Sequence, residues 1–251
     1  MINIMTYEVL GIVSLAAGFL SAIAGSSGLI ILPVLLIVGV PPQIALGTNK
    51  LYTTTSLITS ALCFIRNGFF SPRFWIATSI ATAIGTLFGV GLTQIFSNQT
   101  LKTLLPLLIA IMAIYLLLPK KPWKRLNPPA TPKCRKGLAV SALLGLYSGF
   151  LGAGTGSLWT MIATSMFGKD IMEASAISRF MCFFSNFVAL IVFVLLSQID
   201  YSIGLILSIG GAIGAYFGSR LAIRWGAKFM RTILVSSTLV MAGNLALSNW
   251  I

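Results

Sequence analysis

The sequence predicts an all-α polytopic membrane protein built from two inverted-topology repeats. Three observations predict this fold class. The chain is 57% hydrophobic with a mean hydropathy of +0.97, its first half recurs in its second half, and its basic residues gather at one set of segment ends. Apolar stretches of roughly 17–25 residues, the length of a membrane-spanning helix, follow one another along the chain. They do not alternate between polar and apolar residues as the strands of a membrane barrel would.

The internal repeat aligns residues 24–118 with residues 153–247 without a gap. Identical pairs include Ala24 and Ala153, Gly25 and Gly154, Gly39 and Gly168, Ser56 and Ser185, Gly85 and Gly214, and Gly89 and Gly218. One further pair, Lys50 and Arg179, puts a cation at the same point of each half, deep in apolar sequence. A repeated apolar unit with a paired charge is the pattern of a transporter made of two related halves.

Each half is expected to hold a short, broken or re-entrant helix pair followed by three transmembrane helices. The expected segments are 8–24, 28–40, 43–65, 73–96 and 100–118, and then 137–153, 157–168, 171–196, 201–224 and 229–249. The short segments are marginal as full spans, and glycine-rich turns join them, Gly-Ser-Ser-Gly at 25–28 and Gly-Thr-Gly-Ser at 154–157. We therefore expect each pair to meet inside the protein, where irregular backbone is tolerated.

A proline-rich basic linker, residues 119–136, separates the first repeat at 1–118 from the second at 137–251, and it carries seven of the 17 Lys and Arg residues. Because each half has an odd number of segments, the second repeat should be inverted in the membrane. With the linker in the cytoplasm, every other basic residue except Lys50, Lys102 and Arg179 falls on that same side, as the positive-inside rule requires. Both termini are then expected on the non-cytoplasmic side.

The composition argues against several other functions. The net charge of +13 is interpreted as topogenic and not as a sign of nucleic-acid binding, because it lies at segment ends and in the linker. The chain has no His and only four Asp and Glu residues, which argues against His-based catalysis and against a carboxylate dyad. The three cysteines have no metal or disulfide spacing. We expect no enzyme activity, no cofactor and no metal.

Lys50 and Arg179 are the first candidates for a binding site. Each should lie roughly 10 Å below the membrane boundary at 1.5 Å per residue, one from each side, so both approach the midplane. A charge there is costly and by default suggests a function. The hypothesis is an anion-binding site. The alternatives are that the two side chains snorkel to the interface, or that Arg179 pairs with Glu173 or Asp170.

The glycine turns and the helices that carry the cations add polar groups to this candidate site. Helix N-termini offer free N–H groups and a positive dipole end, which suits an anion. Candidate contacts from the turns are Ser26, Ser27, Thr155, Gly156 and Ser157. Further polar candidates at helical spacing from the cations are Asn49, Thr53, Ser178, Cys182 and Asn186. The alternative for the turns is that their glycines only permit close helix packing, which is also the expected role of Gly85, Gly89, Gly210, Gly214 and Gly218.

Several glycine motifs occur in the same order in both halves. They are Gly18-Phe19-Leu20 through Gly28, Gly39 to Pro42 and Ala45 to Thr48 in the first half, and Gly149 to Gly156, Ala174 to Ser178 and residues 210–221 in the second. In this order they resemble the sulfite exporter TauE/SafE family, also called the 4-toluene sulfonate uptake permease family, over nearly the whole chain. The resemblance implies an inner-membrane, multi-pass carrier of sulfur-containing anions with an inverted repeat. The chain departs from the family pattern in its glycine turns and at Lys50 and Arg179.

We interpret the chain as a secondary membrane transporter of small sulfur-containing anions that exports sulfite, or alternatively an organosulfonate, by alternating access. No nucleotide-binding motif is present in the sequence, so an ion or substrate gradient should drive it. The alternatives are an anion channel and a carrier of thiosulfate or another reduced sulfur species that touches Cys63 or Cys182. The expected partners are the anion and membrane lipid, without nucleic acid, and a homodimer is left open.

Overall fold

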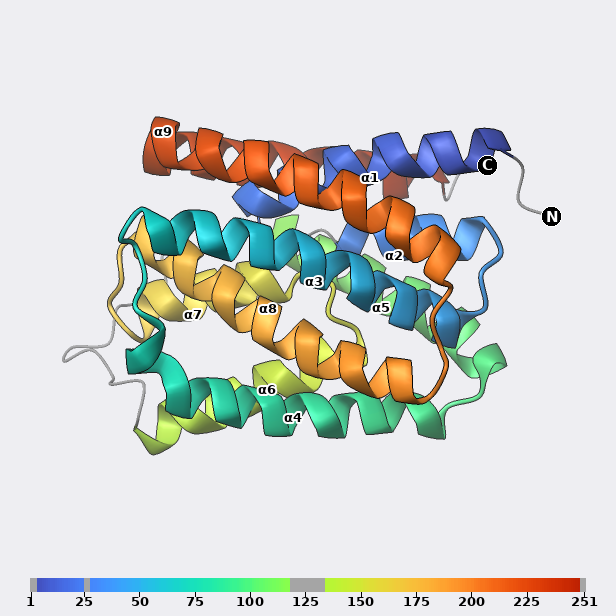
Figure 1. Ribbon diagram of the computed structural model, residues 1–251, viewed down its shortest axis with the longest axis horizontal. Coiled ribbons are helices and arrows are strands. Elements are labelled where there is room, and N and C mark those ends of the chain that lie inside the picture. The colour runs from blue at the N-terminus through green and yellow to red at the C-terminus, as the bar shows by residue number, and fades with distance from the viewer. Residues whose placement is uncertain (1–3, 25–27, 118–133, 249–251) are drawn as a thin grey trace.

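The computed structural model describes residues 4–24, 28–117 and 134–248, and within these ranges the chain is helical, with short turns and no strand. The elements in chain order are α1 (Ile4–Ala24), α2 (Gly28–Ile37), α3 (Pro42–Arg66), the short 3-10 helix η1 (Pro72–Trp75), α4 (Ile76–Ile95), α5 (Asn98–Leu117), α6 (Arg135–Phe150), α7 (Thr155–Ser165), α8 (Ile171–Leu195) and α9 (Tyr201–Ser248). The helices lie side by side along one direction (Figure 1). The predicted all-α class is confirmed.

Local sequence explains where the central helices begin and end. α3 starts at Pro42, because a proline at the first helical position loses no hydrogen bond, and it is followed by Gly68 with a φ of +78°. α8 starts after Asp170, whose carboxylate accepts from the N–H groups of Met172 and Glu173 at 2.8 Å. α9 is interrupted at Gly226, with φ 71° and ψ −165°, between the two segments that the sequence predicts there.

α3 and α8 form the centre of the molecule. They pack against each other, run in opposite directions (Figure 1), and occupy matching positions in the sequence repeat, since residues 42–66 align with 171–195. The outer helices exchange between halves, because α1 packs on α9 and α6 packs on α4. α1 and α6 stand just before the aligned stretches of the two halves, and η1 with α4 aligns with the first part of α9. The first helix of each half, α1 or α6, therefore packs against a helix of the other half.

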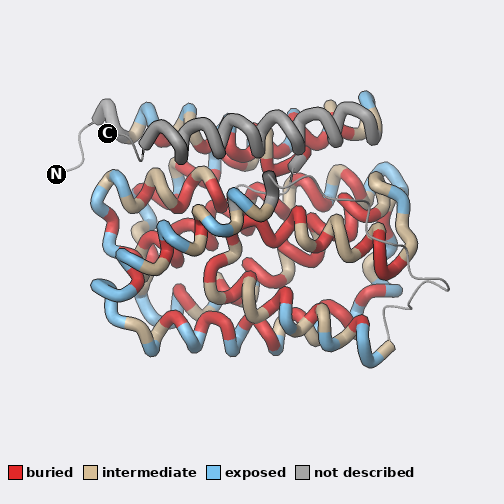
Figure 2. Tube along the Cα trace, turned by 180° about the vertical axis from the view of Figure 1, so that it is seen from behind, coloured by how far each residue is buried: buried red, intermediate tan, exposed pale blue. Residues whose placement is uncertain are grey.

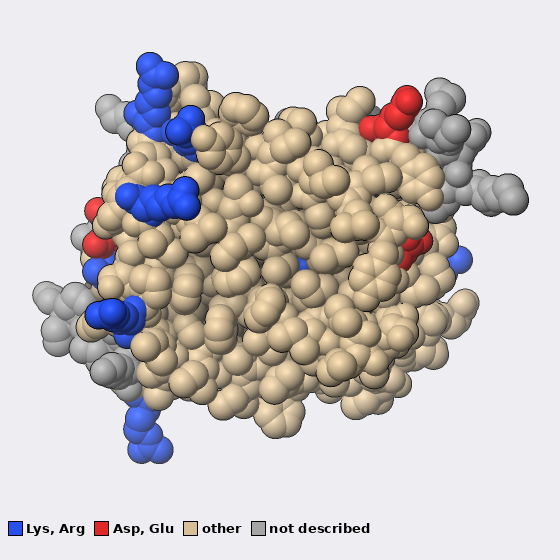
Figure 3. All heavy atoms as spheres, viewed as in Figure 1, with Lys and Arg blue, Asp and Glu red and all other residues tan. Residues whose placement is uncertain are grey.

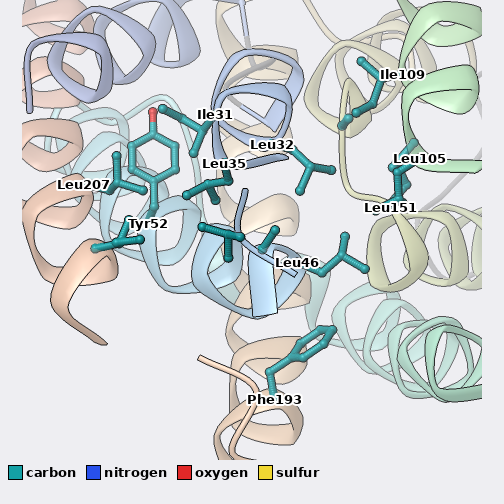
Figure 4. Close-up of a cluster of buried hydrophobic side chains, with 14 of the residues drawn as sticks. Ile31, Leu32, Leu35, Leu46, Tyr52, Leu105, Ile109, Leu151, Phe193 and Leu207 are labelled. Atoms are coloured by element: carbon teal, nitrogen blue, oxygen red, sulfur yellow. The ribbon is translucent and has the colours of Figure 1, made fainter. Parts of the chain in front are cut away.

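The short helix α2 lies inside this arrangement. It has 10 residues and is about 15 Å long, which is half of a membrane core. Its Ile31, Leu32 and Leu35 are fully buried and pack in one apolar cluster with residues of α3, α5 and α9 (Figure 4), among them Leu46, Leu105 and Leu207. α7 is of similar length, with 11 residues. α2 and α7, the second helix of each short pair, are therefore too short to span a bilayer.

Glycines bring the outer helix pairs into backbone contact. A methyl group at Gly85 of α4 would lie 1.9 Å from the carbonyl oxygen of Ala142 in α6, and one at Gly89 would lie 2.1 Å from that of Leu146. On the other side of the molecule, a methyl at Gly214 of α9 would lie 2.0 Å from the carbonyl oxygen of Leu15 in α1. No side chain fits at these positions, so the packing role predicted for them is confirmed.

The surface fits a membrane. Among the described residues, the segments 72–95, 171–195 and 201–226 are long and apolar enough to cross a bilayer. Large apolar side chains are exposed along α4 and along the described part of α9, and exposed and buried residues alternate along the helices in Figure 2. Most Lys and Arg on the face in Figure 3 gather at one end of the helices, and the middle of that face is almost uncharged. The chain is therefore a membrane protein.

Gly85→Ala should destabilise the protein, because the new methyl group meets backbone of α6 that cannot rotate away. Overpacking of this kind costs about 1–3 kcal/mol. Gly91→Ala is the matched control in the same helix, since nothing lies within 4 Å of a methyl there. Thermal unfolding of the two purified variants in detergent checks this, and equal melting temperatures would contradict the packing role.

Candidate functional site

Lys50 lies on α3 and is fully buried. Its ammonium group donates to the carbonyl oxygen of Ser148, close to the C-terminal end of α6. The last carbonyls of a helix have no partner within the helix and carry the negative end of its dipole. Lys50 therefore binds the end of a helix that belongs to the other half of the chain.

Arg179 occupies the matching place on α8 and is 1% exposed. Its Nη2 donates to the carbonyl oxygens of Ala22 and Ile23, both at 2.8 Å, and its Nε donates to Ala22 at 3.1 Å. Nη1 donates to Ser175 at 3.1 Å, and the ring of Phe64 lies 5.6 Å from Cζ. Ala22 and Ile23 are at the end of α1. Arg179 of the second half therefore binds a helix end of the first half, as Lys50 of the first half binds one of the second.

These contacts differ from both alternatives considered for the cations, which were snorkelling to the interface and pairing of Arg179 with Glu173 or Asp170. The two side chains do not reach the interface, because both are buried. The acids near Arg179 are engaged elsewhere, since Asp170 caps α8 and Glu173 forms an ion pair with Lys169 at 3.2 Å. The partners are backbone carbonyls, which every residue type carries, so sequence reasoning could not find them.

Gly28, the last residue of the first glycine turn, lies next to Ala153, which precedes the second turn. Residues 25–27, which include the predicted Ser26 and Ser27, are outside the described residues. Gly28 opens α2, and a methyl there would lie 3.3 Å from the Cα of Ala153 and 3.6 Å from the side-chain nitrogen of Asn49. In the other turn Gly152 and Gly154 both have a φ of +77°, and a methyl at Gly152 would lie 2.8 Å from the Lys50 nitrogen. Glycine is needed there both for the backbone conformation and for the cation.

The start of α7 is tied to its surroundings by hydroxyl groups. Thr155 donates to the carbonyl oxygen of Gly152 at 2.9 Å. Ser178 of α8 donates to the carbonyl oxygen of Gly156 at 2.6 Å, which fixes α7 on α8. Ser157 is 8% exposed. The predicted residues Thr155, Gly156 and Ser178 thus come together in one place, and the hydroxyls of Thr155 and Ser178 both already have protein acceptors.

A second polar group joins α3 to α8. Thr53 donates to the side-chain oxygen of Asn186 at 3.1 Å, and its hydroxyl also lies 2.7 Å from the carbonyl oxygen of Asn49. Asn186 in turn donates to the carbonyl oxygen of Cys182 at 2.7 Å. The structure therefore brings the predicted Asn49, Thr53, Cys182 and Asn186 to the same α3–α8 contact as Lys50.

Two buried polar atoms next to Lys50 have no hydrogen-bond partner among the described residues. They are the side-chain oxygen of its chain neighbour Asn49 and the hydroxyl of Ser148, whose own carbonyl binds Lys50. Buried polar atoms nearly always have a partner, so both call for an explanation. Sequence reasoning missed Ser148, since one serine in an apolar helix gives no signal. Lys50 thus adjoins Asn49 in α3 and binds Ser148 of α6, and both of these residues carry a side-chain oxygen without a partner among the described residues.

The profile of the family described as "Sulfite exporter TauE/SafE" matches residues 10–245. The chain belongs to the sulfite exporter TauE/SafE family. A "Probable membrane transporter protein" of Haemophilus influenzae is 32% identical over 97% of this chain and 96% of its own length. One from a Sinorhizobium species is 33% identical over 90% of this chain and 87% of its own length, and YfcA of Escherichia coli is 29% identical over 98% and 91%. No solved structure matches the chain.

Membership of the TauE/SafE family confirms the resemblance that the glycine motifs suggested. The match covers both halves and the linker, and the relatives carry the names of membrane transporters. Neither the family nor these names indicate catalysis. Membrane transport is therefore the function class that the family and these relatives indicate for the chain.

Arg179→Lys should destabilise the protein although it keeps the charge. A lysine cannot hold Ala22 and Ile23 with a planar fork. Each hydrogen bond lost from the charged group costs roughly 1.5–3 kcal/mol. Thermal unfolding in detergent is the measurement, with the same exchange at the exposed Arg66 as control. A variant as stable as the control would show that the helix-end contacts contribute little.

Proposed function

We propose that this TauE/SafE protein is a secondary carrier that exports a small sulfur oxyanion across the bacterial inner membrane by alternating access. Sulfite is the first candidate and an organosulfonate the second. The observation that carries the proposal is Lys50, a fully buried cation whose neighbour Asn49 and whose partner Ser148 each have a side-chain oxygen without a hydrogen-bond partner among the described residues. A buried charge in a membrane protein is costly, and a bound anion would offset that cost.

In this proposal the anion binds beside Lys50. The ammonium group has three donors and spends one on Ser148 among the described residues. The hydroxyl of Ser148 and the amide of Asn49 can donate from either side, since the orientation of an amide is an assignment and can be reversed. The N-termini of α2 and α7 would add N–H groups, with Ser26, Ser27, Thr155, Gly156 and Ser157 as the predicted contacts. Several donors around one point suit a compact oxyanion.

Arg179 has a different part in the same site. Four of its hydrogen bonds go to carbonyl oxygens, and a guanidinium has five N–H groups. We therefore assign to it mainly the positioning of α1, with its charge and its fifth donor directed to the anion. Cys182, Ser178 and Thr53 complete the predicted lining around the two cations.

We also propose that the two halves are related by a pseudo-two-fold axis in the membrane plane. The antiparallel course of α3 and α8 supports this (Figure 1), as does the exchange of α1 and α6 between the halves. The basic end of the molecule (Figure 3) would face the cytoplasm together with the linker 119–136, and both termini the other side. The broken helices would then lie near the midplane, where transporter sites of this design are found.

Lys50→Ala should weaken sulfite transport strongly. One charge-assisted contact is worth roughly 1.5–3 kcal/mol, which corresponds to about a 10- to 150-fold loss of affinity. Arg66→Ala, at the exposed end of the same helix, is the control and should change affinity less than about twofold because solvent screens its charge. The measurement is the concentration dependence of sulfite flux into proteoliposomes, with thiosulfate, an organosulfonate and chloride as competitors.

Two results of this measurement would count against the proposal. If folded Lys50→Ala protein transports sulfite like the unchanged protein, Lys50 is not part of the site. If flux rises linearly with sulfite concentration and shows no counter-flow, the protein is a channel and not a carrier.

Topology is tested by single cysteines at Ile2, Thr131 and Trp250 in a cysteine-free background. Because the basic residues should stay inside, an impermeant thiol reagent should label positions 2 and 250 in whole cells but not position 131. Labelling of 131 alone would reverse the proposed orientation, and labelling of only one terminus would rule out an inverted repeat.

A further inference from the structure

Two helices of this protein end inside the bundle, and each meets a cation there. α1 ends at Ala24, and Arg179 binds the carbonyl oxygens of Ala22 and Ile23. α6 ends at Phe150, and Lys50 binds the carbonyl oxygen of Ser148. A helix end carries about half a negative charge. In carriers built from inverted repeats, such half-helix ends and the unwound carbonyls beside them coordinate the Na⁺ or H⁺ that drives transport.

In this chain a side-chain nitrogen fills that position in both halves. Lys50 belongs to the first half and binds α6 of the second, whereas Arg179 belongs to the second half and binds α1 of the first. Both are almost completely buried. The two residues are also equivalent in the sequence repeat, so a side-chain cation is placed at a helix end at the same point of both halves. A coincidental contact would not be expected to recur at both helix ends.

We propose that Lys50 and Arg179 are built-in replacements for a coupling metal cation, so that the anion crosses the membrane without Na⁺. The transport part of this proposal rests on the proposed function. The cation sites themselves do not, because they are defined by the helix ends and not by a substrate.

The two contacts also predict what happens when the side chain that carries the cation is removed. Lys50→Ala deletes three carbons and the nitrogen but leaves the Ser148 carbonyl at the end of α6 in place. A free n-propylammonium ion has the deleted atoms and could donate to that carbonyl. Tetramethylammonium carries the same charge but has no N–H group, so it is a matched control for a hydrogen-bonding cation.

The first experiment measures sulfite flux by the unchanged protein in proteoliposomes in sodium, potassium and choline salts of equal ionic strength. The proposal expects rates that agree within about twofold. A tenfold or greater requirement for sodium would overturn it. If no sulfur anion moves in any of these salts, the proposed function fails, and the second experiment decides on the cation sites alone.

The second experiment measures melting temperatures in detergent without any substrate. Lys50→Ala should melt lower than the unchanged protein, and n-propylammonium should recover part of the loss where tetramethylammonium does not. In the unchanged protein and in Arg66→Ala, n-propylammonium and tetramethylammonium should change the melting temperature by the same amount. If Lys50→Ala melts like the unchanged protein, or if both ions act on it alike, α6 has no cation site.

Discussion

A helix that stops inside a membrane protein must have its last carbonyl groups satisfied by the protein, because no bulk water is available there. This constraint governs the arrangement of the chain. α1 and α6 both stop in the interior, and the donors that meet their ends are Arg179 and Lys50. Each donor comes from the central helix of the opposite half. The positions of α3 and α8 relative to α1 and α6 are therefore tied together by two buried contacts between side chain and backbone.

The same contacts solve the problem that the cations would otherwise create. Desolvating a charge costs several kcal/mol, and removing the partner of a buried charge costs about 3–5 kcal/mol. Each cation binds a helix end of the other half. The two halves therefore depend on each other for the balance of these charges. Glycines at the helix crossings make this geometry reachable. Gly85 and Gly89 let α4 touch the backbone of α6, and Gly214 lets α9 touch that of α1.

How much the sequence revealed depended on whether a feature belongs to side chains or to backbone. Apolar runs and glycine spacing predicted the helices, the break near Gly226 and the close packing at Gly85, because these follow from residue type. Asn49 and Thr53 could be placed near Lys50 from helical spacing. The partners of Lys50 and Arg179 could not be found in this way, because every residue has a carbonyl group and only the tertiary fold brings the last ones of α1 and α6 to a cation. Ser148 was missed because a single serine in an apolar helix gives no signal.

The two cations also differ in a way that fits a cycle of binding and release. Arg179 holds two successive carbonyls with a planar fork and has Phe64 against its guanidinium, a geometry that a lysine cannot imitate. Lys50 is a point charge with one carbonyl acceptor among the described residues, and its ammonium can turn to a new acceptor without breaking a paired geometry. Within the proposed mechanism, Arg179 is suited to keep α1 in place throughout the cycle. Lys50 is suited to move between the end of α6 and an arriving anion, which would link occupancy of the site to the position of the turn between α6 and α7.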